Sequence, residues 1–140
     1  MTDVNIADAF GASEGRDQRF AIYVPNQDKD GNAVAQDMWV NQALTLLSDI
    51  CGGATAMPPI RGAWLNAASG NLILEEPVLV YTYIDPDEFE RRLAEVVQLV
   101  QEIGKQTRQG QMAIEFNQTF YLIDIIDDVG GIGGTGRGSD

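Results

Sequence analysis

The chain has 140 residues, 44% of them hydrophobic, and a formal net charge of −12 from 21 acidic and 9 basic residues. The length predicts one domain with its own core. The charge disfavours nucleic-acid and anionic-membrane partners, because these are held mainly by lysine and arginine. Histidine is absent and cysteine occurs once, which excludes imidazole chemistry and a structural zinc site. We expect no metal and no cofactor.

The two ends of the chain differ in composition from the segment between them. Residues 1–18 are small and polar without clear periodicity, and we interpret them as a flexible N-terminal arm. Residues 127–140 contain six of the fifteen glycines, and ordering such a segment costs much entropy while burying little. We therefore predict a disordered tail there and a single folded domain over residues 19–126.

The localisation has to be inferred from missing signals. The sequence has no apolar run long enough to span a bilayer and no pattern of a secretory signal, and its single cysteine allows no intrachain disulfide. These features are typical of cytoplasmic proteins. We expect a cytoplasmic protein without a membrane partner.

The first half of the domain begins with a strand and a helix. Apolar residues alternate over residues 19–24 and Pro25 ends the run, which predicts a strand. Spacings of three and four then predict a helix over about 35–50, with Gly52–Gly53 at its end. After a loop, residues 62–66 form a short predicted strand.

The second half continues with strands around one clear helix. Residues 71–84 read as one long strand, with a bulge or kink near Glu75–Pro77 because proline cannot donate in a ladder. Asp85, Pro86 and Glu88 form the start signal of a helix that runs to about Gly104. Residues 111–116 and 119–124 then predict two strands joined by a tight hairpin.

This order of elements is β-α-β-β-α-β with one additional strand. It predicts an α+β ferredoxin-like sandwich in which an antiparallel sheet carries two helices on one face, with an extra C-terminal strand. The first and third strands would lie side by side in the centre of the sheet.

The face of this sheet without helices suggests a function. Because side chains alternate along a strand, Tyr23, Leu79, Tyr81 and Tyr83 share that face, and exposed aromatic patches often mark interfaces. We predict a non-catalytic domain, rather than an enzyme, that self-associates or binds a protein partner there. The alternative is that other segments of the chain cover the patch. RNA binding through these tyrosines is disfavoured, because the sequence lacks the basic octamer of RNA-recognition motifs and the charge is negative.

The loop from Gly52 to Trp64 supports a second hypothesis. Thr55, Arg61 and Trp64, together with Glu75 on the neighbouring strand, would form a small-molecule site. An anionic metabolite is the expected ligand, and an enzymatic role is possible. The simpler interpretation makes the loop a connector, with Trp64 in the core and the glutamates in solvent.

Two further motifs are weak. Residues 26–37 partly match a calcium loop, but Asn26 and Asp37 stand where aspartate and a bidentate glutamate are usual. An Asx/Gly-rich turn is the better interpretation. Residues 131–136 spell the glycine pattern of dinucleotide-binding turns, yet too few residues follow for the helix that the pattern requires.

Overall fold

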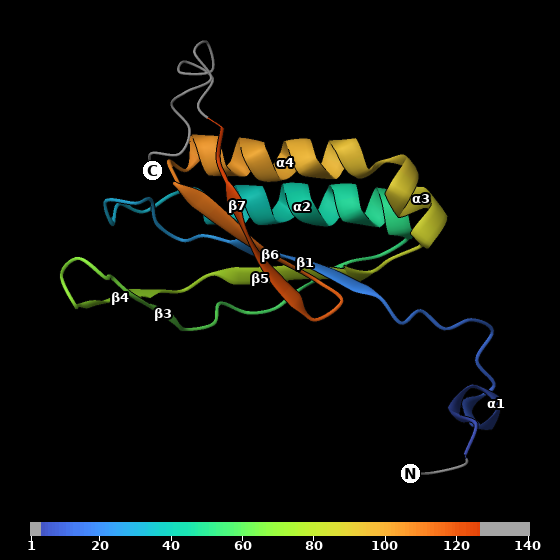
Figure 1. The fold of residues 1–140 in the computed structure, drawn as a ribbon. Helices are drawn as coiled ribbons and strands as arrows, with labels where there is room; N and C mark the ends of the chain where they lie inside the picture. The colour runs from blue at the N-terminus through green and yellow to red at the C-terminus, as the bar shows by residue number, and fades with distance from the viewer. Residues whose placement is uncertain (1–3, 127–140) are drawn as a thin grey trace.

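A computed structural model of the chain describes residues 4–126, and the glycine motif at 131–136 and the predicted tail at 127–140 lie outside them. The main sheet is antiparallel with the strand order β2-β5-β1-β6-β7. Its strands are β1 (Arg19–Val24), β2 (Thr55–Ala56), β5 (Val78–Tyr83), β6 (Gln111–Phe116) and β7 (Thr119–Asp124). Figure 1 shows α2 (Gln36–Cys51) and α4 (Leu93–Gln106) packed on one face of this sheet. The predicted α+β sandwich with two helices on one face is confirmed.

The centre of the sheet is the pair β1 and β5, which run antiparallel from Arg19 opposite Tyr83 to Val24 opposite Val78. This confirms that the first strand lies beside the strand before the second helix. The strand β2 was predicted as loop, and it has only two residues, Thr55 and Ala56, at the sheet edge. The ferredoxin-like topology stays a prediction.

The core lies between the helices and the sheet. Ile22 and Val24 of β1 and Val80 of β5 have no exposed surface, and they meet Leu47 of α2 and Ile103 of α4. Side chains alternate between the two faces of a sheet, and these three strand residues point to the same face. This single face supplies the apolar surface that both helices bury.

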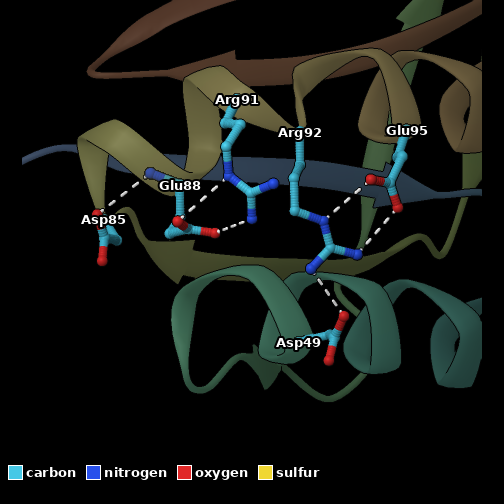
Figure 2. A network of polar contacts seen from close by, with 6 residues as sticks. All are labelled: Asp49, Asp85, Glu88, Arg91, Arg92 and Glu95. Atoms are coloured by element: carbon cyan, nitrogen blue, oxygen red, sulfur yellow. Dashed lines mark hydrogen bonds and ion pairs between the residues drawn. The ribbon is translucent and has the colours of Figure 1, made fainter.

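The second predicted helix is two helices, α3 (Pro86–Arg91) and α4, separated at Arg92. Asp85 accepts the N–H of Glu88 as predicted for an N-cap, but Arg92 has φ −111° and ψ 18°, which ends the first helix. Figure 2 shows the Arg92 guanidinium between Glu95 of α4 and Asp49 of α2, with a 2.8 Å bond to Asp49. Exposed ion pairs contribute little net stability, so this network mainly orients α4 against α2.

The two-residue turn Asn117–Gln118 joins β6 and β7. Both residues have positive φ, 50° and 78°, as a two-residue turn between twisted strands requires. The tight hairpin is confirmed, and the bounds of both strands are those predicted from the sequence.

The N-terminal arm contains one short helix, α1 (Ile6–Phe10), which Figure 1 shows apart from the sheet and its helices. Phe10 is 82% exposed. Arg16 links the arm to the domain, because its Nη1 donates to the carbonyls of Cys51 and Tyr83. The flexibility predicted for residues 1–18 stays a prediction. None of the helices in residues 4–126 has the length and hydrophobicity that a membrane-spanning helix needs.

The long strand predicted over residues 71–84 is divided in two. Its first part, β4 (Leu72–Glu75), leaves the main sheet and pairs with β3 (Gly62–Leu65) in a separate two-stranded hairpin. The main-sheet strand β5 starts only after Pro77. The predicted kink at Glu75–Pro77 is therefore a complete break, and Figure 1 shows the β3–β4 hairpin extending beyond the sheet.

The segment that resembled a calcium loop is an Asx turn. The buried Asp28 carboxylate accepts the N–H groups of Asp30 and Asn32 at 2.8 and 2.9 Å. Arg108, after α4, lies 3.6 Å from the same carboxylate. In the part of the chain that the structure describes, no cluster of three or more carboxylate, cysteine or histidine residues has the geometry to hold a metal ion.

The acid stability of the protein should depend on Asp28. The hydrogen bond from the Asn32 backbone, followed by that from Asp30, holds the pKa of Asp28 below its usual range. A carboxylate with a lowered pKa stabilises the folded state above its ordinary pKa, and this contribution is lost as the pH falls through the lowered value. Asp28→Asn should therefore lower the melting temperature by a few degrees at about pH 7 and hardly at all near pH 2. Thermal denaturation across this range tests it, with the exposed Asp17→Asn as control. An equal difference between wild type and Asp28→Asn at both pH values would contradict it.

Candidate functional site

The candidate site is a hollow of about 400 Å³ between the β3–β4 hairpin and the sheet face opposite the helices. This volume is typical of pockets that take small organic ligands. The hairpin and the loop before it supply one wall, and strands β1, β6 and β7 supply the other. The aromatic, charged and amide side chains of its lining that could contact a ligand include Tyr23, Arg61, Trp64, Glu75, Gln109 and Phe120.

Two aromatic rings form the sheet side of the hollow. Tyr23 of β1 and Phe120 of β7 meet edge to face, with ring centroids 5.9 Å apart. Tyr23 follows the core residue Ile22 directly, and Phe120 lies three residues before Ile123, which packs against the core. Because side chains alternate along a strand, both rings point away from the helices. Phe120 is 52% exposed, which leaves an aromatic surface free for a ligand.

The Tyr23 hydroxyl is held by a carboxylate. It donates a short hydrogen bond to Glu115 of β6, and Arg19 lies 3.6 Å from the other oxygen of Glu115. Burial, and then the bond to Glu115, raise the pKa of Tyr23 to about 12. Tyr23 therefore stays a neutral phenol and hydrogen-bond donor at physiological pH.

A second carboxylate lies on the hairpin side. Glu75 is opposite Gly62 in the β3–β4 pair, and Trp64 is two residues further along β3. The Trp64 indole N–H donates to the Glu75 carboxylate across this diagonal, a separation that long side chains bridge. Gly62 has no side chain, so nothing stands between the two groups.

Arg61 is the free cation of the site. Of the six arginines in residues 4–126, five make ion pairs with carboxylates, namely Arg16, Arg19, Arg91, Arg92 and Arg108. Within the same residues Arg61 makes no hydrogen bond or ion pair. An unpaired guanidinium at a hollow is suited to bind a carboxylate or phosphate of a ligand.

The structure brings together three of the four residues predicted for a ligand site. Arg61, Trp64 and Glu75 line the same hollow, whereas Thr55 lies at the sheet edge opposite Tyr81 and does not line it. The simpler interpretation that placed Trp64 in the core is wrong, because its side chain is 40% exposed. Sequence reasoning did not connect Tyr23 and Phe120 to this loop, although the parity of Tyr23 placed it on the correct face.

The predicted interface is only partly open. Leu79 is buried at 7% exposure, Tyr81 is half-buried under the Arg19 guanidinium, and Tyr23 faces the hollow. Among the four predicted residues, only Tyr83 is largely exposed, at 48%. The chain therefore covers much of this face itself, which was the alternative considered from the sequence.

A larger hollow of about 1300 Å³ lies along the outer surfaces of α2 and α4. Two of the three carboxylates that line it, Asp49 and Glu95, already bind Arg92. It has no aromatic side chain in its lining. The smaller hollow, with aromatic rings, a carboxylate and an unpaired guanidinium, is the better candidate for a ligand site.

The comparisons with known proteins give a likeness of fold. No protein-family model matches the chain, and no curated protein matches it. A phage SAM lyase in complex with S-methyl-5'-thioadenosine is 19% identical with a TM-score of 0.56, covering 79% of this chain and 92% of that one. The same kind of enzyme in its apo state is 21% identical with a TM-score of 0.52, covering 80% of this chain and 92% of that one.

These structures correct the preferred functional prediction. Both neighbours are enzymes, and one of them holds a small molecule. The prediction that favoured a non-catalytic assembly domain over an enzyme is contradicted. The finding supports the alternative that we gave second, a small-molecule site with an enzymatic role.

The environment of Tyr23 leads to a titration experiment. Tyr23 should ionise only near pH 12, because burial and the bond to Glu115 raise its pKa. Because its pKa is raised on folding, Tyr23 stabilises the fold at lower pH and loses this contribution as the pH rises from about 10 to 12. Absorbance at the phenolate band should show a delayed step that Tyr23→Phe removes. If Tyr83→Phe removed the delayed step instead, the assignment would be wrong.

Proposed function

We propose that this protein is an enzyme that binds an S-adenosyl sulfonium compound in the hollow and releases S-methyl-5'-thioadenosine from it. The proposal is supported by two facts. The fold is similar to that of phage SAM lyases, whose name means cleavage of S-adenosylmethionine. The hollow independently combines aromatic rings, a carboxylate and an unpaired guanidinium.

The side chains of the hollow match the groups of such a substrate. S-adenosylmethionine carries an adenine ring, a positively charged sulfur, an ammonium group and a carboxylate. Aromatic faces such as those of Trp64 and Phe120 attract flat rings and cations, and Glu75 attracts the positive groups. The free Arg61 guanidinium is suited to the substrate carboxylate. The observation that carries the proposal is this unpaired arginine next to the Trp64–Glu75 pair.

The reaction itself consists of breaking one carbon–sulfur bond. The electron pair of that bond goes to the sulfonium sulfur, which becomes the neutral thioether of S-methyl-5'-thioadenosine. The remaining four-carbon fragment either loses a proton to a base or forms a bond between its own carboxylate oxygen and the carbon that lost the sulfur. Glu75 is the proposed base in the first case, and in the second it binds the positive groups of the substrate so that the substrate's own carboxylate lies in line with the breaking bond.

The binding part of the proposal predicts thermal stabilisation by the product. S-methyl-5'-thioadenosine at 100 times its dissociation constant should stabilise the protein by about 2.7 kcal/mol, because it binds only the folded state. Trp64→Ala and Phe120→Ala should abolish most of the shift in melting temperature. Tyr83→Ala, an exposed aromatic on the same sheet face but outside the hollow, is the matched control. A full shift in the Trp64→Ala protein would place the ligand elsewhere.

The catalytic part predicts turnover that depends on Glu75. Purified protein incubated with S-adenosylmethionine should release S-methyl-5'-thioadenosine, measured by chromatography, and mass spectrometry of the second product distinguishes an unsaturated acid from a cyclic ester. Glu75→Gln should lower kcat by about 100-fold, the usual contribution of a general base or of a group that orients the reacting atoms. Arg61→Ala should raise KM about tenfold. The exposed Glu90→Gln is the control. No release by the wild-type protein would refute the proposed function.

A further inference from the structure

The root of the β3–β4 hairpin is held by two side chains, Asn26 just after β1 and Gln36 at the start of α2. Glu76, between β4 and Pro77, donates its backbone N–H to Asn26 Oδ1 at 2.9 Å. Its carbonyl accepts a hydrogen bond from Gln36 Nε2 at 3.0 Å. The same Nε2 also donates to the Val24 carbonyl at 3.0 Å. Two side chains thus satisfy both backbone polar groups of Glu76 and tie it to the end of β1.

This bend has few other attachments. Pro77 has no N–H, so the ladder between sheet strands cannot pass through it. The backbone bond from Ile60 to the Pro77 carbonyl, at 3.0 Å, joins the two strands of the root to each other. The bond from Gln27 Nε2 to the Leu74 carbonyl is long, at 3.4 Å. Asn26 and Gln36 therefore make the main polar links between the root and β1.

The hairpin itself gains little from its own packing. A two-stranded sheet in water is marginally stable when it does not pack against other elements. Its large apolar residues are between 40% and 68% exposed, namely Trp64, Leu65, Leu72, Ile73 and Leu74. The position of Trp64 and Glu75 then depends on how the root is fixed.

We propose that Asn26 and Gln36 are positioning residues that fix the hairpin root and so hold Glu75 and Trp64 over the hollow. Neither side chain lines the hollow, so they act through Glu76, the residue next to Glu75. Their role in turnover rests on the proposed function, whereas their effect on the hairpin does not.

The direction of the two hydrogen bonds allows a matched test. Asn26 acts as the acceptor, so Asn26→Asp keeps its bond and Asn26→Leu removes it. Gln36 acts as the donor, so both Gln36→Met and Gln36→Glu remove its bonds, since a carboxylate cannot donate to carbonyls. Asn26→Asp and Gln36→Glu each add one negative charge, so charge alone cannot explain a difference between them.

The position of the hairpin can be followed through Trp64. The chain has two tryptophans, and Trp39 lies in the core of α2 at 7% exposure. In a Trp39→Phe background, acrylamide quenching and the emission maximum report Trp64 alone. Hydrogen exchange of the amides in residues 62–75, compared with residues 111–124 of the β6–β7 hairpin, reports the hairpin backbone.

Loss of either link should loosen this hairpin selectively. Asn26→Leu, Gln36→Met and Gln36→Glu should increase exchange in residues 62–75 about five- to tenfold, the factor of one net hydrogen bond, and should increase quenching of Trp64. Exchange in residues 111–124 should not change, and Asn26→Asp should behave like wild type. Unchanged exchange and quenching in Asn26→Leu and Gln36→Met would overturn the proposal, as would equal loosening by Asn26→Asp and Asn26→Leu.

Turnover gives the second readout. Asn26→Leu should lower kcat for release of S-methyl-5'-thioadenosine at least fivefold, and Asn26→Asp should restore it. If wild-type protein released no product while the hairpin loosened as expected, the proposed function would fail and the fixing of the hairpin would stand. If the hairpin loosened while kcat stayed unchanged, the positioning role would be overturned.

Discussion

The break in the chain at Glu76–Pro77 is the constraint on which the site depends. Since Pro77 has no N–H, β4 cannot continue as the ladder of β5, and it pairs with β3 outside the main sheet. The main sheet meanwhile buries one face under α2 and α4. The hairpin that leaves at the break extends beyond the sheet, and the hollow forms where the base of the hairpin meets the other sheet face. Pro77 thus separates the main sheet, which is the scaffold, from the β3–β4 hairpin, which forms one wall of the site.

The elements of the scaffold followed from local sequence rules because each has its own strong signal. The alternating run of β1, the glycines after α2 and the capping residue Asp85 mark their elements without help from tertiary structure. The strand β2 has no such signal, since two residues carry no periodicity and only the edge of β5 makes them a strand. The division of α3 from α4 was also not predictable, because Arg92 departs from helical geometry while it binds Asp49 of another helix.

The site was less predictable, for a physical reason. Trp64 and Glu75 belong to the two strands of one hairpin and Arg61 directly precedes the first strand, so strand pairing alone brings them together. Tyr23 and Phe120 line the same hollow only because the base of the hairpin lies next to this sheet face. The parity argument placed Tyr23 on that face correctly. The predicted function, an open interface on that face, was wrong. The periodicity of β1 indicates which face a side chain occupies but not which other segment of the chain lies over that face.

The distribution of charge is consistent with a site for a cation. The chain carries a net charge of −12, and five of the six arginines in residues 4–126 are already neutralised by carboxylates of the chain itself. Such a field attracts a positively charged substrate and raises its local concentration at the site. Under the proposed function the sulfonium loses its charge when the carbon–sulfur bond breaks, so the thioether product no longer experiences this attraction. The same carboxylates then favour binding of the substrate over retention of the product, and Arg61 remains to orient the one anionic group of the substrate.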